Sequence, residues 1–303
     1  MSSRGIIYLA LLVLIVSSCL SNKVEENDPD INLAFNVIVK SHTRADDIDA
    51  DYPLDVPFGV WSYSLPADKS WIKDSKEAVE VQNQEAVIYD NISGLWKPKS
   101  NMLWLSSENS MSFFAYSPYS RACSFSKEKG IYITDFSINE ECDLLFSEYI
   151  YDLNKLSANG VVNIPFISAL TKVEFQIRSS LPDGSIIRVK HLKLRNVASV
   201  GDFFSLPEAG WENHSGYDDF TFFEGEVEIG DEPSILGECR QMIPQTIHPT
   251  IEMLCDIISG DYVLYDQILT VDGRMNWSIG KVCTYNLKVT TDLTFIIESS
   301  LNE

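Results

Sequence analysis

The sequence predicts an all-β protein built as two antiparallel β-sandwich domains in tandem. Three observations support this prediction. Apolar and polar residues alternate over short stretches, as they do in strands with one buried face. Turn residues separate these stretches at short intervals, and apolar residues at helical spacing are scarce. Short strands divided by turns are typical of antiparallel sandwiches rather than of parallel βαβ units.

The predicted strands fall into two sets, separated by a polar turn at residues 156–160. The first domain, residues 45–160, has predicted strands at 56–65, 85–89, 95–98, 102–105, 112–118, 130–136 and 143–147. The second domain, residues 161–303, has them at 161–166, 172–178, 186–194, 201–206, 224–229, 240–244, 250–255 and 282–289. Residues 148–156 are expected to form one or two helical turns.

The bulk composition indicates a globular body and argues against one class of partner. The chain has 303 residues, 45% of them hydrophobic and 11% aromatic, which is ample for a buried core. Its formal net charge of −21 argues against nucleic acid, because binding phosphates requires stripes of lysine and arginine.

The N-terminus has the layout of an export signal. Residues 1–18 contain a basic residue, Arg4, then an apolar run at 5–16 and two serines, followed by Cys19. The run is shorter than the roughly 20 residues that a membrane-spanning helix needs. Cys19 after Val16-Ser-Ser is similar to a bacterial lipobox, in which the cysteine is acylated, so we expect a lipid-anchored protein. An ordinary secretory signal with an incidental cysteine remains the alternative.

Residues 19–44 are predicted to be a lipidated tether that ends in a detachable first strand. Larger apolar residues alternate with other residues along this strand, which places Leu33, Phe35, Val37 and Val39 on one face. It ends before Arg44-Ala45, which precedes an acidic stretch, and exposed polar segments of this kind are where proteases cut. Removal of a strand leaves an apolar groove with unpaired backbone groups, which another chain can fill.

The residues give no support for catalysis, and we expect neither an enzyme nor a cofactor. The four histidines lie in no zinc-binding arrangement, and no nucleophile elbow, P-loop or dinucleotide motif follows a strand. Residues 46–55 resemble the start of a calcium loop. However, Tyr52 stands where glycine is needed and Phe58 where the bidentate glutamate is needed, so no metal is expected and a solvated acidic loop is favoured.

The cysteines and tryptophans are expected to lie in the core. Five cysteines beyond Cys19 form no disulfide framework, although Cys239 with Cys255 is left open as a bridge. The six tryptophans could form a sugar-stacking platform, but on alternating strands they more often fill the core. Exposed, coplanar tryptophans would favour the alternative function, a surface glycan-binding lipoprotein of a polysaccharide uptake system.

Several motifs in order resemble the fimbrillins, the FimA-like and Mfa-like lipoproteins of Bacteroidales. The N-terminal pieces are the lipobox at 16–19, Thr43-Arg44-Ala45 and Phe58-Gly-Val-Trp-Ser-Tyr. Further pieces follow at 95–98, 111–118, 143–147, 165–177, 242–246 and 277–287. Two departures are Ser168, where family members commonly carry histidine, and a C-terminal segment that is apolar only as far as Ile297.

The resemblance implies two transthyretin-like β-sandwich domains and export as a lipoprotein to the outer membrane, exposed at the cell surface. It also implies that an Arg-specific protease cuts after Arg44 and removes the first strand. A strand from a neighbouring subunit then fills the groove and builds a fimbria, or pilus. The implied partners are therefore other fimbrial subunits, the protease, the outer membrane and a ligand on a host or bacterial surface.

Overall fold

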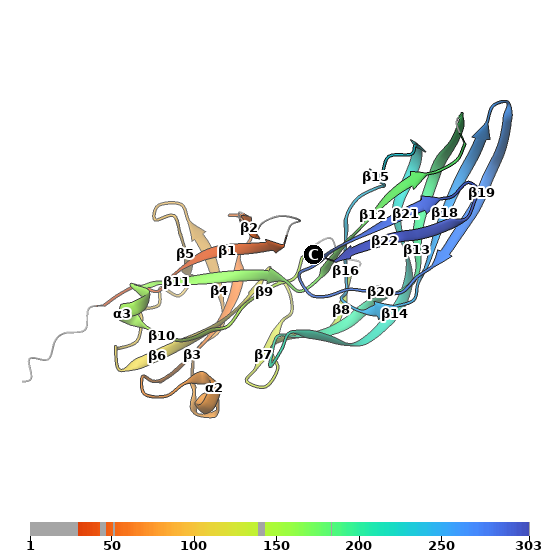
Figure 1. Ribbon diagram of the computed structural model, residues 1–303. Helices are drawn as coiled ribbons and strands as arrows, with labels where there is room; N and C mark the ends of the chain where they lie inside the picture. Colours follow the sequence, from red (N-terminus) through yellow and green to blue (C-terminus); the bar gives the residue numbers. More distant parts are fainter. Residues whose placement is uncertain (1–29, 43–46, 51, 139–142, 183, 303) are drawn as a thin grey trace, which may run out of the picture. The chain divides into compact units, whose positions relative to one another are not determined.

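The protein is all-β, as the sequence predicts. The computed structural model describes residues 30–42, 47–50, 52–138, 143–182 and 184–302. In the described part, the helices are three short pieces, α2 (Trp71–Asp74), η1 (Ser75–Glu77) and α3 (Lys155–Ala158). All other regular structure consists of strands arranged in the sheets below (Figure 1).

The first sheet has nine strands, in the order β10-β6-β3-β4-β5-β1-β11-β9, with β2 beside β1. β9 also pairs with β6, so seven of these strands close into a ring. The ring surrounds a buried core that includes Phe35, Phe58 and Phe113. The strands are β1 (Ala34–His42), β2 (Asp47–Ala50), β3 (Phe58–Pro66), β4 (Val79–Asp90), β5 (Leu95–Pro98), β6 (Asn109–Ser117), β9 (Leu145–Ser147), β10 (Ile150–Asn154) and β11 (Val161–Ser168).

A second and a third sheet enclose another core, to which Phe175, Leu192 and Tyr285 belong. The second sheet contains β7 (Ser124–Ser126), β8 (Gly130–Ser137), β13 (Ser185–Phe204), β14 (Gly210–Ile229), β18 (Thr250–Ser259) and β19 (Tyr262–Asp272). The third contains β12 (Thr171–Ser179), β15 (Ser234–Ile235), β16 (Arg240–Met242), β21 (Val282–Val289) and β22 (Phe295–Asn302), and a separate pair joins β17 (Thr246–Ile247) to β20 (Met275–Asn276). A further core cluster contains residues of both strand sets, such as Phe146 and Phe203.

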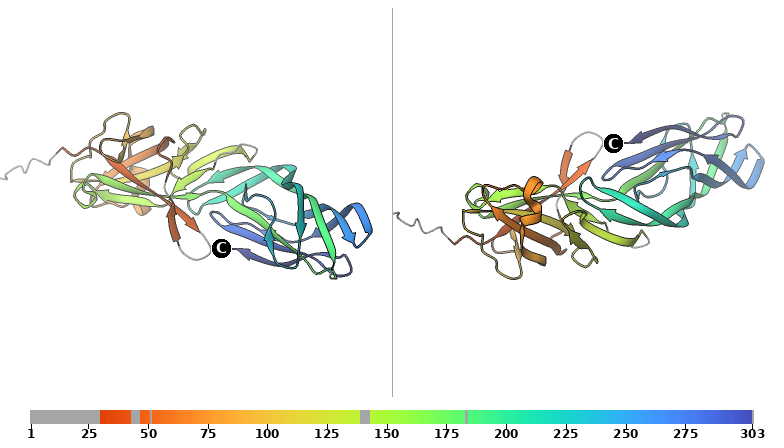
Figure 2. Two further views of the ribbon diagram at one scale, coloured as in Figure 1. Left: turned by 90° about the horizontal axis from the view of Figure 1, so that it is seen from above. Right: turned by 90° about the horizontal axis from the view of Figure 1, so that it is seen from below.

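Two strand pairs differ from the antiparallel arrangement that the sequence predicts. β1 runs parallel to β11, and β12 runs parallel to β21. Figure 1 and both views of Figure 2 show the orange-red β1 beside the green β11. No hairpin joins the strands of either pair, because more than a hundred residues separate them in the chain. The connection between the two strands of each pair is therefore long enough to allow parallel pairing.

The sheets connect residues on both sides of position 160. β11 follows this position but belongs to the first sheet, whereas β8 precedes it and pairs with β13. The division into domains 45–160 and 161–303 stays a prediction. The helical turns expected at 148–156 are wrong for most of their length, because β10 occupies 150–154 and pairs with β6.

Candidate functional site

The candidate site is the first strand, β1, and the groove that it occupies in the ring. β1 lies between β5 and β11. Its pairing with β11 continues over six residues, from Ala34 opposite Val161 to Val39 opposite Phe166. Its pairing with β5 is limited to Phe35 opposite Trp96. β1 is therefore joined firmly on one side and weakly on the other, so its removal would open the ring.

The side chains predicted to face inward do so. Leu33 is 2% exposed and Phe35 is fully buried, while Val37 and Val39 are partly buried against the same core. Phe35 contacts Phe58 and Phe113 edge to face, at ring-centre distances of 5.9 and 5.8 Å. Burial of Leu33 and Phe35 contributes about 3–6 kcal/mol. A protein is usually stable by only about 5–15 kcal/mol, so this burial is a large part of what a fold of this kind can lose.

Backbone hydrogen bonds fix the chain at the point where it enters the groove. The backbone N–H of Leu33 donates to the carbonyl of Met102, and that of Ala34 donates to the carbonyl of Gly160. Gly160 has φ +80°, and a Cβ added there would lie 2.4 Å from Cγ2 of Ile31. Glycine is required at 160 because the backbone is left-handed there and the entering strand lies against it. The segment 102–105, predicted as a strand, serves here as an anchoring loop.

The opposite end of β1 forms a hairpin with β2. Val39 pairs with Ala50 and His42 with Asp47, so the joint 43–46 connects two strands that lie side by side. Part of the acidic stretch, Asp47–Ala50, is therefore a strand rather than a loop, whereas residues 53–55 are exposed and lie outside any strand. Among the described residues, β2 pairs only with β1. The predicted cleavage residues Arg44 and Ala45, and the predicted lipidation residue Cys19, lie outside the described residues.

Polar contacts border β1 without crossing the core. Nδ2 of Asn36 donates to Oδ1 of Asn163 at 3.1 Å on the exposed face, and Lys40 pairs with Glu148 at 2.5 Å. Because both partners of the ion pair are about 40% exposed, solvent screens it, and it contributes about 0–1 kcal/mol. Apolar packing therefore dominates the retention of β1.

Ser168, where the resemblance expects histidine, is the last residue of β11 and takes part in a small polar network there. Its hydroxyl donates to Oδ1 of Asp143 at 2.7 Å and accepts the backbone N–H of Leu170. Burial raises the pKa of the Asp143 carboxyl, and the bond from Ser168 opposes that rise. Ser168 thus fixes a partly buried carboxyl.

The tryptophans and cysteines are mainly core residues, as predicted. Five tryptophans are 3–5% exposed, and Trp211 is partly buried with its indole N–H donating to the carbonyl of Ala169. This placement provides no coplanar tryptophan surface for a glycan. Cys123, Cys255 and Cys283 are buried, whereas Cys239 is exposed, contrary to the prediction for it. All four are free thiols, so Cys239 and Cys255 form no bridge, and Cys142 lies outside the described residues.

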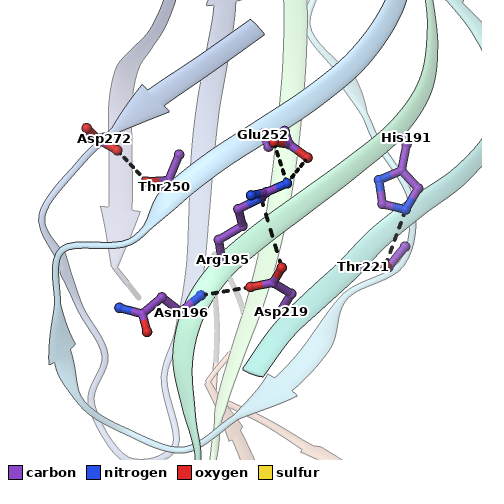
Figure 3. Close-up of polar contacts among 8 residues, drawn as sticks. All are labelled: His191, Arg195, Asn196, Asp219, Thr221, Thr250, Glu252 and Asp272. Atoms are coloured by element: carbon purple, nitrogen blue, oxygen red, sulfur yellow. Dashed lines mark hydrogen bonds and ion pairs between the residues drawn. The ribbon is translucent and has the colours of Figure 1, made fainter. Parts of the chain in front are cut away.

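Charged residues outside the groove join neighbouring strands of the second sheet (Figure 3). Arg195 on β13 pairs with Glu252 on β18 at 2.7 Å, and its Nε lies 4.0 Å from Asp219 on β14. The carboxyl of Asp219 also accepts the backbone N–H of Asn196. These ion pairs and this hydrogen bond join three neighbouring strands, and each charged group among them has a partner.

Two further classes of site have no counterpart in the described part of the chain. No group of three or more histidine, cysteine, aspartate and glutamate side chains there could hold a metal ion. Nor does any helix there have the length and apolar character needed to cross a membrane.

The sequence prediction named the strand but missed the residues that receive it. Phe58 and Phe113 form the pocket for the Phe35 ring, and β11 supplies the backbone ladder. Both phenylalanines lie in stretches that the sequence predicted as strands, at 56–65 and 112–118. Nothing local shows that they contact a strand that begins at residue 34.

The fold and the groove define a class of protein: an all-β body in which the first strand completes a ring of strands. The profile of the fimbrillin-like family matches residues 43–303, and the chain belongs to this family. No curated protein is significantly similar in sequence.

Solved structures of Bacteroides proteins share the fold. A fimbrial protein from Bacteroides vulgatus ATCC 8482 is similar with a TM-score of 0.70 and 16% identity, over 90% of this chain and 99% of that one. A protein from Bacteroides uniformis ATCC 8492, provisionally described as a cell adhesion protein, has a TM-score of 0.56 and 14% identity, over 90% and 98% of the two chains.

Proposed function

We propose that this protein is a structural or accessory subunit of a cell-surface fimbria, assembled by strand exchange after export and proteolysis, and that it contributes to cell adhesion. It acts as a building block rather than as an enzyme. The observation that carries the proposal is the position of β1, which closes the ring through one pair with β5 and a six-residue ladder with β11.

The maturation steps follow the order of the chain. Residues 1–18 direct export, and acylation of Cys19 anchors the precursor in the outer membrane. An Arg-specific protease cuts between Arg44 and Ala45, and β1 is then free to leave. A strand of another subunit occupies the groove and regains the apolar burial that Leu33 and Phe35 provided. The fimbria then presents surfaces to a host or bacterial ligand.

The test is maturation of purified precursor in vitro. Full-length protein in mild detergent is treated with an Arg-specific protease. N-terminal sequencing is expected to find a new terminus at Ala45, and gels without boiling are expected to show a ladder of polymers. The variant Arg44→Gln serves as the control, and we expect it to remain uncut and monomeric.

Two results would reject strand exchange. One is cell-surface protein with an intact Arg44-Ala45 bond that nevertheless forms polymers. The other is cut protein that keeps the fragment 19–44 bound after every attempt at assembly.

A further inference from the structure

A groove lies on the first sheet where β3 begins and β6 ends. Because these strands are antiparallel neighbours, with Gly59 opposite Tyr116, the loop before one meets the loop after the other. Together they border a groove of about 650 Å³, a size typical of ligand sites. Three prolines and two tyrosines supply most of its apolar lining: Pro53, Pro57, Pro118, Tyr52 and Tyr119.

Hydrogen bonds between the two loops hold the groove open in one shape. The backbone N–H of Tyr119 donates to the carbonyl of Pro57 at 2.8 Å. The hydroxyls of Tyr52 and Ser117 lie 2.5 Å apart and form a second hydrogen bond, between the loop before β3 and the end of β6. Tyr52 is 5% exposed and stacks on Phe166 of the core, so the floor is fixed, whereas Tyr119 is 38% exposed at the rim. A preformed site loses little freedom when it binds.

The charges that line the groove are all negative. Asp55 and Asp143 contribute carboxyls, and no lysine or arginine lies among the lining residues. The Asp143 carboxyl already accepts hydrogen bonds from Ser168, Gln241 and the backbone N–H of Leu144 and feels the charge of Lys172, whereas Asp55 is exposed. The groove therefore complements a ligand that is apolar along its length and carries a positive charge at one end.

We propose that this groove binds an extended peptide, whose proline or leucine side chains lie against the prolines and tyrosines and whose lysine or arginine pairs with Asp55. Aromatic-lined grooves recognise extended proline-rich segments in this way, because such segments are already ordered before they bind. The inference does not depend on the departure of β1.

A glycan fits the groove less well than a peptide. A sugar presents hydroxyls on every side, and each one that is buried needs a hydrogen-bond partner. The hydroxyls of Tyr52 and Ser117 already bond each other, and the carboxyl of Asp143 already accepts from Ser168. Of the polar side chains that line the groove, this leaves those of Asp55, Tyr119 and Ser120, which are too few to satisfy a buried sugar.

The test measures fluorescence anisotropy of labelled peptides with the full-length protein in mild detergent. The probes are Arg-Pro-Leu-Pro-Pro-Leu-Pro, the same peptide with Gln in place of Arg, and a Gly-Ser peptide of equal length. We expect saturable binding of the first, weaker binding of the second and none of the third. Tyr119→Ala is expected to weaken binding about tenfold.

Asp55→Asn provides the charge test. It is expected to weaken binding of the arginine peptide by up to about fivefold, to leave the Gln peptide unchanged, and to remove the salt dependence. Tyr217→Ala, which removes a 59% exposed tyrosine on β14, is the matched control and is expected to have no effect. Urea unfolding midpoints confirm that each variant is folded.

The proposal is overturned if the first two peptides fail to bind saturably, or if Tyr119→Ala and Asp55→Asn both leave binding unchanged. Retention of polysaccharide by this groove, lost in Tyr119→Ala, would also overturn it in favour of a glycan.

Discussion

Asn36 and Asn163 face each other across the parallel strands β1 and β11, and the amide of Asn36 donates to that of Asn163 at 3.1 Å. Because both side chains lie on the exposed face, this pair marks the register of β1 against β11 without taking part in the core. The contact joins residues 127 positions apart in the chain, which makes it a direct probe of whether β1 stays or leaves.

The first prediction is that Asn36→Cys with Asn163→Cys locks β1 in place. Neighbouring strands lie about 4.8 Å apart, which is within the Cα range of a disulfide. In a Cys239→Ser background, which removes the exposed thiol, we expect the oxidised variant to be cut by protease but to retain its first strand. Polymers should appear only after reductant is added.

Non-reducing gels and mass spectrometry measure this outcome. Each single cysteine variant is a control that should polymerise like the Cys239→Ser background. If the oxidised double variant polymerises as readily as the reduced one, departure of β1 is not required.

The second prediction concerns Phe35, whose fully buried ring contacts Phe58 and Phe113. Phe35→Ala leaves a cavity and is expected to lower the free energy of unfolding of the uncut protein by about 3–5 kcal/mol. Asn36→Ala, next to it on the exposed face, should cost at most about 1 kcal/mol. Urea unfolding at 25 °C compares the two, and equal losses would show that β1 does not close the core.

The sequence was sufficient to predict the strand class and the inward face of β1, because alternation is a local property. Leu33 and Phe35 could be identified in this way. The partner of β1 could not, because its ladder is formed with β11 more than a hundred residues later.

Strands without strong alternation were also hard to predict. β14 spans twenty residues, but most of its side chains are exposed, so no buried face marks its whole length. The groove between β3 and β6 was missed for a related reason: Pro118 is distant in the chain from Pro53 and Pro57, and it meets them only because β3 pairs with β6.

The third prediction contrasts two buried indoles. Trp277 donates to the hydroxyl of Tyr285 at 3.0 Å, whereas the indole N–H of Trp104 has no hydrogen-bond partner among the described residues. Trp277→Phe leaves a buried hydroxyl without its donor and should cost about 2–4 kcal/mol. Trp104→Phe removes an unsatisfied donor, which offsets its small cavity, so it should cost less than about 1 kcal/mol. Urea unfolding measures both, and a reversed order would contradict the assignment.

The fourth prediction uses two aspartates with opposite pKa shifts. Burial raises the pKa of Asp143 above its ordinary value. The folded state therefore favours its protonated form, and the charged form is a cost at every pH above the raised value. Asp256, which is 3% exposed, is different, because hydrogen bonds from Lys190 and from the backbone N–H of Asp266 lower its pKa. The charged form of Asp256 stabilises the fold at pH values above the ordinary pKa of an aspartate. This stability is lost as the pH falls through the lowered pKa of the folded state.

The two asparagine variants should therefore change the melting temperature in opposite directions at neutral pH. At pH 7, Asp143→Asn is expected to raise the melting temperature, because it removes a partly buried charge. Asp256→Asn should lower it, because Lys190 keeps Asp266 but loses the other of its two carboxylate partners. The gain from Asp143→Asn should disappear below about pH 4, where the unfolded chain is also protonated. The loss from Asp256→Asn should shrink over the same acidic range as its charge is neutralised. Thermal unfolding followed by circular dichroism at pH 7, 5 and 3 measures both differences. Shifts of the same sign at pH 7 would show that one of these carboxyls is not in the environment described.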